Sequence, residues 1–443
     1  MTASADAPLT VLLSPPPTPN GPLHVGHLAG PYVAADVAAR AARARGERVL
    51  TVCGTDDHQN YVVTRADRDG RGPDAVVADH GARIREVFAR ARVEHDVHTS
   101  PSTDPAYRRA VGDLFALVDR AVLTAGPPAL ACRDCHRTLH HAYVAGRCPG
   151  CRAAMGGGTC EECGEFATAR DLVAAACARC GGPPVETDRP TRVLRLEEHR
   201  AGLTEVWSRA ALPDRVRGLL AALLRRGLPD VPASYPTDWG LPGGTGRIDV
   251  WFEMGLAYLS VVARSVDPDA RTLDDHVRAW RRLGGLWAFL GVDNAFYYAA
   301  LFPALLLATG VPAERCLSGL VVNEFYRLDG EKFSTSRDHA VWAHDLLRTA
   351  DPETVRLYLS LDRPAPHPTN FTTAAFQRFA RRPWSAGPPL TPGEVDRAGQ
   401  ALRLAHFDPA TAVRCLLPAA GAGDPAAVRL LDLVRGRATE ARG

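Results

Sequence analysis

The chain has 443 residues, of which 46% are hydrophobic and 23% are charged, so a mainly disordered protein is excluded and about two to four folded domains are expected. Its 52 lysine and arginine residues nearly balance 50 acidic residues, which excludes a strong overall field for nucleic acid and makes any RNA binding local. Lys332 is the single lysine. Unless it persists by chance, it predicts a crowded site where a compact ammonium handles phosphate.

No targeting or membrane signal is visible. Residues 1–13 lack the basic segment and the long apolar run of a secretory signal. The longest apolar stretch, residues 295–311, contains Pro303, which favours a buried helix over a membrane span. We therefore expect a cytoplasmic protein that has no membrane partner. In that compartment the eleven cysteines are expected to bind metal or to stay reduced.

The N-terminal sequence has the rhythm of a parallel α/β sheet. A short apolar strand is predicted over residues 9–13, then a proline-rich turn over 14–22 and a helix over 23–45. A second strand over 48–53 ends in the polar stretch 54–58. A strand, turn, helix and strand in this order are typical of parallel sheets.

The middle of the chain interrupts this pattern. Helical periodicity returns over 75–92 and 105–124, before a Gly- and Cys-rich segment at 131–184 that cannot form a hydrophobic core unaided. Strand-like sequence then resumes at 248–252 and continues into a second α/β half through 318–322. The sheet is therefore predicted to be split by an insertion.

From residue 344 the pattern is helical, and after Phe379 it is rich in Pro, Gly and Ala with short helical runs. The patterns divide the chain into five expected segments. They are a first catalytic half (1–125), a connective insertion (126–235, with its cysteines at 132–180), a second catalytic half (236–343), a helical region (344–385) and a short helical remnant (386–443).

His24 and His27 lie where a strand and a turn lead into a helix. A helix start presents unpaired backbone N–H groups and a partial positive charge, which favour phosphate. Both histidines would share one face of the first turn, and Gly26 would let a nucleotide approach the backbone. Read alone, the pattern fits a structural role about as well.

Eight cysteines form four C-x-x-C units within 49 residues. They are Cys132/Cys135, Cys148/Cys151, Cys160/Cys163 and Cys177/Cys180. Two such units supply the tetrahedral sulfur set that zinc prefers, so the spacing predicts two structural zinc sites. A thiol redox role is the weaker alternative, because the segment lacks a thioredoxin-like setting. Cys53, Cys316 and Cys415 are expected to be packing residues.

Taken together and in this order, the motifs resemble class I aminoacyl-tRNA synthetases, and most closely their methionyl-specific members. The resemblance covers roughly residues 8–380. It is carried by the four cysteine pairs and by residues 15–27, 54–58, 250–252, 291–293 and 332–336. It implies an α/β fold with a Rossmann-like (HUP-type) parallel sheet split by a zinc-knuckle insertion, followed by a short α-helical C-terminal region.

The resemblance also implies roles for individual residues. The catalytic set is His24, His27, Lys332 and Ser334. The ATP-binding set is Asn20, Gly26, Gly291, Asp293, Lys332, Ser336 and Arg337. The amino-acid-binding set is Pro16, Thr18, Asp56, Trp251, Tyr258 and Tyr298, in which Asp56 would hold the substrate ammonium. Magnesium would accompany ATP, and the middle two cysteine pairs would share one zinc while the outer two share another.

Several positions depart from the family pattern. Thr335 replaces a second lysine, so one phosphate contact is missing or passes to Arg337. The walls expected to contact a methionine side chain are also changed, at Pro16, Thr18, Tyr298 and the pair Met254 and Gly255. These changes argue for a substrate other than methionine, with Thr18 and Tyr298 offering hydroxyls to a polar one. A repacked methionine pocket is the alternative.

Only 64 residues follow Phe379, which would not hold the complete helical anticodon-binding bundle of the family. A truncated member is therefore expected, with tRNA as a partner but doubtful anticodon recognition. We expect ATP-dependent formation of an aminoacyl adenylate, with transfer to tRNA or another acceptor. The alternatives are an amino-acid ligase of specialised metabolism with a small-molecule acceptor, such as an N-hydroxylated amino acid, and a non-catalytic binding paralogue.

Overall fold

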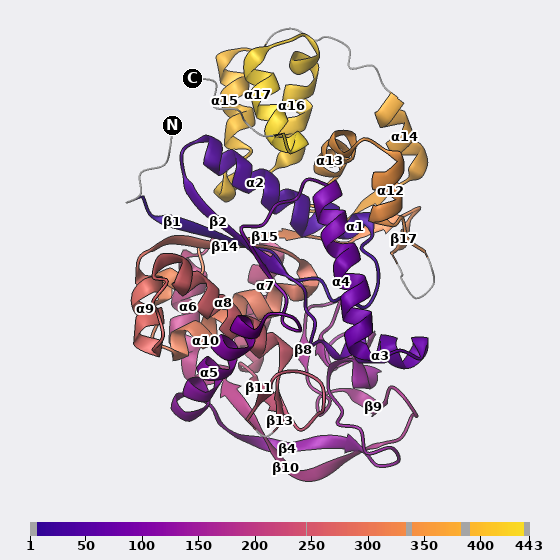
Figure 1. Cartoon of the computed structure of the whole chain (residues 1–443), viewed down its shortest axis with the longest axis vertical. Coiled ribbons are helices and arrows are strands. Elements are labelled where there is room, and N and C mark those ends of the chain that lie inside the picture. Colours follow the sequence, from indigo (N-terminus) through magenta and orange to yellow (C-terminus); the bar gives the residue numbers. More distant parts are fainter. Residues whose placement is uncertain (1–6, 245, 334–338, 382–389, 438–443) are drawn as a thin grey trace.

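The computed structural model describes residues 7–244, 246–333, 339–381 and 390–437, whose arrangement is shown in Figure 1. At its centre is a parallel sheet with the strand order β15-β14-β1-β2-β3. The strands are β1 (Leu9–Leu13), β2 (Arg48–Gly54), β3 (Val97–Thr99), β14 (Leu283–Gly291) and β15 (Gly319–Asn323). The predicted parallel α/β sheet is confirmed, and β1 has the predicted bounds.

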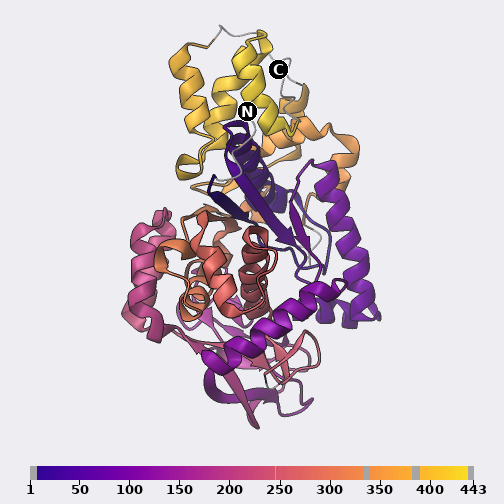
Figure 2. The ribbon, with the colours of Figure 1, turned by 60° about the vertical axis from the view of Figure 1, so that its left-hand side comes forward.

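Helices cover both faces of this sheet (Figures 1 and 2). Along β1, Val11 and Leu13 join the core that contains α8 (Val250–Val266). The intervening Leu12 packs on the opposite face against α2 (Val33–Ala44). Because both faces are buried here, residues 11–13 form an unbroken apolar run rather than an alternating one.

The first crossover and the helices that follow it lie between β1 and β4. They are α1 (Val25–His27), a π-helical turn (Leu28–Tyr32), α2, α3 (Asn60–Asp69), α4 (Pro73–Arg90) and α5 (Pro105–Ala121). Local sequence explains their starts. Proline occupies the first turn of α4 and α5, and Asp104 caps α5 by accepting from the N–H groups of Ala106 and Tyr107.

The strand order places a switch point at the centre of the sheet. From β1 the chain moves outward to β2 and β3, and it later returns on the other side of β1 as β14. The loops that follow Leu13 and Gly291 therefore diverge, and the crevice between them is where parallel sheets bind ligands.

Between β3 and β14 the chain forms a second, antiparallel sheet with the order β12-β13-β11-β10-β4. Its strands are β4 (Thr124–Cys132), β10 (Pro184–Arg195), β11 (Asp230–Tyr235), β12 (Pro242–Gly243) and β13 (Gly246–Ile248). The cysteine-rich part contains β5 (Val144–Arg147), β6 (Ala154–Met155), β7 (Gly158–Thr159), β8 (Phe166–Ala167) and β9 (Val173–Cys177). Two helices, α6 (Arg200–Arg209) and α7 (Asp214–Arg226), connect β10 to β11. The predicted interruption of the parallel sheet is confirmed.

The strand predicted at residues 248–252 is wrong. Strand β13 ends at Ile248, and α8 begins two residues later at Val250. Asp249 makes the difference, because its carboxylate accepts from the N–H groups of Trp251 and Phe252 and so caps the helix. The apolar run at this point belongs to a helix that is buried along most of its length.

The apolar stretch 295–311 is buried, as predicted. It contains a π-helical turn (Tyr297–Leu301) and α10 (Phe302–Ala308), which lie in the same core as α8. Two further helices, α9 (Leu273–Arg281) and α11 (Ala313–Cys316), flank β14 and β15. Among the described helices, none is both long enough and apolar enough to cross a membrane.

The C-terminal part combines a small sheet with helices. The sheet has the order β17-β16-β18, from β16 (Tyr326–Leu328), β17 (Glu331–Lys332) and β18 (Thr369–Phe371). The helices are α12 (Ala343–Thr349), α13 (Pro352–Leu361), α14 (Thr373–Arg381), α15 (Pro392–Gln400), α16 (Pro409–Gly421) and α17 (Pro425–Arg435).

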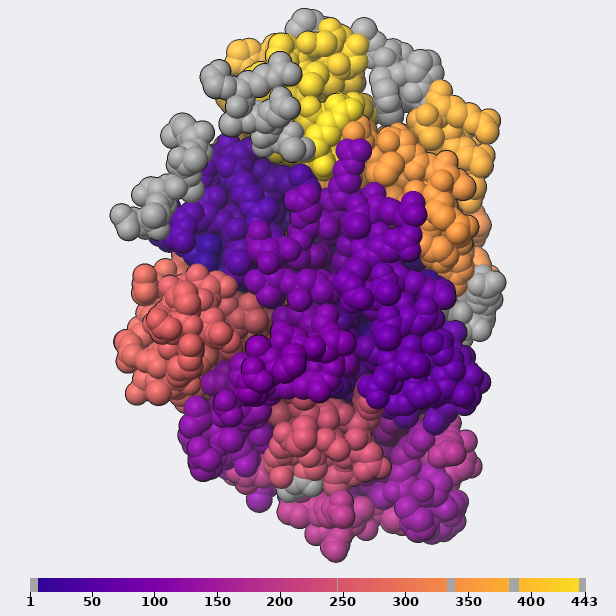
Figure 3. Space-filling view, viewed as in Figure 1, coloured from indigo at the N-terminus to yellow at the C-terminus, as the bar shows by residue number. Residues whose placement is uncertain are grey.

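Arg356 on α13 ties this helical part to the parallel-sheet core. Its fully buried guanidinium bonds Asp36 of α2 at 2.6 Å, the carbonyl of Val434 at 2.7 Å and the carbonyl of Ala91 at 3.0 Å. A buried guanidinium with this many partners fixes three segments relative to one another. In Figure 3 the yellow C-terminal helices lie directly above the indigo N-terminal region.

Candidate amino-acid and nucleotide site

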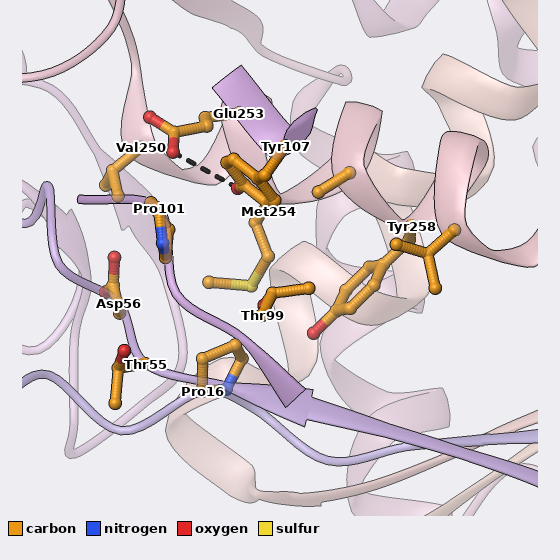
Figure 4. A pocket seen from close by; sticks show the side chains of 12 residues that line it. Pro16, Thr55, Asp56, Thr99, Pro101, Tyr107, Val250, Glu253, Met254 and Tyr258 are labelled. Atoms are coloured by element: carbon orange, nitrogen blue, oxygen red, sulfur yellow. Dashed lines mark hydrogen bonds between the residues drawn. The ribbon is translucent and has the colours of Figure 1, made fainter. Parts of the chain in front are cut away.

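A pocket lies at the carboxyl edge of the parallel sheet, between the loops after β1 and β2 and helix α8 (Figure 4). The loops contribute Pro16, Thr55 and Asp56, and α8 contributes Glu253, Met254 and Tyr258. Three members of the predicted amino-acid-binding set, Pro16, Asp56 and Tyr258, therefore line one space.

Asp56 is buried, and it has no cationic partner in the part of the chain that the structure describes. Its backbone N–H donates to the carbonyl of Pro17 at 3.0 Å, and one carboxylate oxygen accepts from the hydroxyl of Thr18 at 3.3 Å. Burial and the nearby carboxylates of Glu253 and Asp57 hold the pKa of Asp56 well above its usual range. No ion pair with Asp56 occurs among the residues that the structure describes. A bound ammonium would supply the missing charge.

Glu253 is a functional candidate that the sequence reasoning missed. It is 2% exposed, and both of its carboxylate oxygens lie 2.9 Å from Nδ1 of His58, while the hydroxyl of Tyr107 donates to it at 3.1 Å. Burial lowers the pKa of His58, but the Glu253 carboxylate outweighs this effect and the net shift is upward. The sequence signal that could have identified Glu253 is a charged residue within an otherwise apolar run, because a buried carboxylate usually has a specific partner.

Aromatic side chains form the wall behind this pocket. Trp251 stacks on Tyr297, with ring centroids 3.6 Å apart. The hydroxyls of Tyr258 and Tyr298 lie 2.7 Å apart, and the Tyr298 hydroxyl also lies 3.7 Å from the sulfur of Met254. Trp251 and Tyr298, both predicted to contact the amino acid, are not among the residues that line this pocket. The Tyr298 hydroxyl already has partners within the protein.

The two predicted phosphate-binding histidines lie together at the start of α1. The rings of His24 and His27 stack with centroids 3.8 Å apart, and the backbone N–H of His24 donates to Nδ1 of His27 at 3.2 Å. Burial lowers the pKa of His24 well below its ordinary value, and lowers that of His27 to about 4. Both rings are therefore neutral near pH 7 and can donate through an N–H.

Gly26 must be small at this position. A Cβ there would lie 2.9 Å from Nδ1 of His24, so a side chain would displace the histidine ring. Asn20, from the same predicted nucleotide set, lies in the loop before the histidines, where its N–H donates to the carbonyl of Thr18 at 2.9 Å. Both residues therefore belong to the loop and first turn that follow β1.

The other side of the crevice is built by the end of β14. Gly291 ends that strand, and a Cβ on it would lie 2.5 Å from a carboxylate oxygen of Asp293. The backbone carbonyl of Asp293 accepts from the hydroxyl of Thr159 at 2.6 Å. Thr159 precedes Cys160, so the cysteine-rich insertion contacts the segment that carries Asp293 directly.

The segment that begins at Lys332 starts beside the histidines. The ring of Phe333 stacks on His24 with centroids 4.6 Å apart. The backbone of Lys332 pairs with Arg327 in the β16–β17 hairpin. The Lys332 side chain and the predicted residues Ser334, Thr335, Ser336 and Arg337 lie outside the described residues.

The eight cysteines form two sets of four. The outer pairs combine as Cys132, Cys135, Cys177 and Cys180, and the middle pairs combine as Cys148, Cys151, Cys160 and Cys163. This confirms the grouping that the family resemblance implied. The closest sulfur pairs lie 3.4 to 3.6 Å apart. Zinc–sulfur bonds of about 2.3 Å in a tetrahedron require sulfurs about 3.8 Å apart, so both sets fit a closed zinc site.

Each knuckle uses the same turn. The N–H of the residue after the second cysteine donates to the carbonyl of the first cysteine, at 2.8 to 3.1 Å. That donor residue has a positive φ in all four turns, and the four are His136, Arg152, Gly164 and Gly181. The left-handed residue closes the turn and directs both thiols to one side.

Comparison with known proteins places these features in one family. A family described as tRNA synthetases class I (M) matches residues 10–381. A methionine–tRNA ligase from Pyrococcus furiosus is 29% identical over 380 residues, which cover 82% of this chain and 52% of that protein. One from Thermomicrobium roseum is 31% identical over 382 residues, which cover 81% of this chain and 63% of that protein. The chain thus spans about half the length of such relatives, or somewhat more.

The fold comparison agrees. The crystal structure of Mycobacterium tuberculosis methionyl-tRNA synthetase bound by methionyl-adenylate matches with a TM-score of 0.69. The match covers 94% of this chain and 82% of that chain, at 17% sequence identity. At this identity the likeness concerns the fold, and it confirms the predicted architecture.

Proposed function

Because this chain belongs to the class I tRNA synthetases, we propose that it uses ATP to activate an amino acid as an aminoacyl adenylate. The observation that carries the proposal is Asp56. Its carboxyl group is buried, which raises its pKa, and no described cation compensates the charge of the ionised form. Ionising such a group costs free energy unless a ligand brings a positive charge. The α-ammonium of an amino acid is such a ligand, and Asp56 lies at the sheet edge that also carries the two histidines.

In the reaction, an oxygen of the substrate carboxylate attacks the α-phosphorus of ATP. The bond from that phosphorus to the bridging oxygen breaks, and pyrophosphate leaves with the electron pair. Negative charge grows on the phosphate oxygens in the transition state, so donors held in place beforehand supply the rate. We assign this task to His24, His27, Lys332 and Ser334.

The neutral state of the histidines supports this assignment. A neutral imidazole donates one N–H to a phosphate oxygen without the cost of burying a charge in the free protein. When phosphate binds, its negative charge raises the pKa of both rings and strengthens the same hydrogen bonds. Asn20, Gly26, Gly291, Asp293, Ser336 and Arg337 would complete the ATP site, with magnesium on the phosphates.

The acceptor of the activated amino acid is a separate question. Charging of tRNA is the activity named for the relatives, and it is one candidate here. The other candidate is transfer to a small molecule, such as an N-hydroxylated amino acid. The altered pocket wall at Met254 and Tyr298 favours a substrate other than methionine, and such a substrate favours this second acceptor class. A non-catalytic binding paralogue would bind ATP without turnover.

ATP–pyrophosphate exchange without tRNA tests the proposal. The full chain, with zinc and magnesium present, should catalyse exchange with at least one amino acid of a panel of all twenty together with hydroxylated and diamino acids. Exchange with none, under conditions where ATP binding is measured, would overturn the proposal and favour the binding paralogue. Where exchange occurs, transfer of the labelled amino acid to bulk tRNA or to hydroxylamine-type acceptors distinguishes the two acceptor classes.

A further inference from the structure

Met254 connects the Asp56 pocket to the tyrosine pair behind it. Its side chain is 6% exposed and lines the same pocket as Asp56. Its sulfur lies 3.7 Å from the hydroxyl of Tyr298, which is in turn 2.7 Å from the hydroxyl of Tyr258. In Figure 4 the thioether lies between Asp56 and Tyr258. The protein therefore fills the space in front of Tyr298 with its own side chain.

A second cavity lies behind this partition. It is lined by apolar and aromatic side chains that include Leu13, Trp280, Phe302 and Leu306, and both tyrosines also face it. Gly255 lets this cavity form close to α10, because a Cβ there would lie 2.9 Å from Leu305. Tyr258 lines both cavities. Met254 and the tyrosine pair thus separate a pocket that holds a carboxylate from an apolar space of the protein interior.

We propose that Met254 limits the length of the substrate side chain, so that the amino acid activated here is small and uncharged, of the size of glycine, alanine or serine. The inference rests on the proposed function, in which Asp56 holds the α-ammonium. With the ammonium fixed there, a side chain that turns toward α8 meets the Met254 thioether before it can reach Tyr298.

The hydroxyls of the wall argue against a long polar side chain. Thr18 donates to Asp56, while Tyr258 and Tyr298 bond each other. A polar substrate that needed a donor from these hydroxyls would have to break an existing buried hydrogen bond, at a cost of about 1 kcal/mol or more. The structure therefore favours a substrate that needs no polar partner beyond its ammonium and carboxylate.

Substitutions at Met254 test this size limit. In ATP–pyrophosphate exchange, the wild type should prefer alanine over methionine by at least about hundredfold in kcat/KM, because a filled pocket excludes extra methylene groups. Met254→Ala should move that preference toward methionine by at least about tenfold. Met254→Leu, which keeps the volume, should retain the wild-type preference.

Met155→Ala is the matched control, because it shortens the other internal methionine, in strand β6 and away from the pocket. It should leave the preference unchanged. Equal use of methionine and alanine by the wild type, or an unchanged preference in Met254→Ala, would overturn the size limit. If no amino acid supports exchange in any variant, the proposed activity fails instead.

Ligand binding keeps the two failures apart. Non-hydrolysable sulfamoyl analogues of alanyl and methionyl adenylate are compared by thermal shift, which needs no turnover. The alanyl analogue should raise the melting temperature of the wild type, and the methionyl analogue should do so only in Met254→Ala. A larger shift of the wild type by the methionyl analogue contradicts the inference. Met254→Val, which opens part of the same space, replaces Met254→Ala if that variant folds poorly, since loss of a buried side chain costs about 2 to 5 kcal/mol.

Discussion

The nucleotide edge and the amino-acid pocket lie at the same end of one sheet but differ in how they are built. At the nucleotide edge, His24 and Gly26 follow β1, and Gly291 and Asp293 follow β14, all in the residue types that the family resemblance implies. In the pocket, Asp56, which we propose to bind the substrate ammonium, is kept, while Met254 and Tyr298 depart from the family pattern.

The difference separates two tasks. Phosphate is recognised by backbone N–H groups, by charge and by glycines that allow close approach, and these requirements do not depend on which amino acid is activated. Side-chain choice depends on the shape of a small apolar space, which one substitution on α8 can change. If the proposed roles hold, the activation site and its specificity can change independently in this fold.

The largest expected effect is on the amino-acid side. Asp56→Asn should lower the kcat/KM for the amino acid by at least about hundredfold, because the buried ammonium loses its counter-charge. The KM for ATP should change little. The melting temperature should stay constant or rise, since the free protein loses an uncompensated buried carboxylate.

Asp69→Asn, at the exposed end of α3, is the control for this change. It should behave like the wild type in steady-state exchange. If Asp56→Asn kept normal use of the amino acid, the ammonium site would lie elsewhere and the comparison between the two regions would fail.

Lys332→Arg tests the nucleotide edge with the charge kept. We expect kcat to fall by about tenfold to hundredfold, with the KM for the amino acid unchanged, because a planar guanidinium cannot replace a compact ammonium at the phosphates. Arg327→Lys, at the strand partner of Lys332, makes the opposite exchange and should have no effect. Near wild-type turnover of Lys332→Arg would mean that the single lysine persists by chance.

A smaller effect is expected where the insertion supports the nucleotide edge. Thr159→Val removes the hydrogen bond to the Asp293 carbonyl, which is worth about 1 kcal/mol, so the KM for ATP should rise by about fivefold. The KM for the amino acid should not change. Thr168→Val is the control, because among the described residues the Thr168 hydroxyl bonds the local turn residues Arg170 and Asp171. An equal rise in both KM values would show that the two regions are not separable.

The smallest effect is a dependence of stability on pH. His27 has a folded pKa of about 4, below its unfolded value of about 6.5, so the unfolded chain binds a proton first as the pH falls. Its contribution to stability is present above pH 6.5 and is lost between pH 6.5 and 4. Denaturant titrations at pH 7.5 and pH 5 should show less acid destabilisation in His27→Asn than in His367→Asn, an exposed control. Equal acid sensitivity would contradict a buried, neutral His27.

The sequence predicted the parts of the fold that local chemistry determines. The strand at β1 and the four knuckles follow from an apolar run and from cysteine spacing, which need no knowledge of distant contacts. The strand prediction at 248–252 was wrong because an apolar run of this length occurs in buried strands and in buried helices alike. The helix forms here because Asp249 caps its first turn. Glu253 was missed because its partners, His58 and Tyr107, are distant in sequence.

The wall of the pocket could be predicted only in part. The departures at Met254 and Tyr298 were visible as residue changes, and they favoured a substrate other than methionine. Their geometry was not visible, because the contact between the Met254 sulfur and the Tyr298 hydroxyl joins two helices and uses a hydroxyl that had been expected to face the substrate. Packing of this kind changes the expected substrate from polar to small.

The most direct test of the account is the identity of the adenylate. The full chain is incubated with ATP, magnesium and an equimolar mixture of amino acids, and the bound product is released and identified by mass spectrometry. The account predicts one dominant aminoacyl adenylate, from an amino acid smaller than methionine. Methionyl adenylate as the main product would contradict the altered pocket, and absence of any adenylate from a protein that binds ATP would contradict activation itself.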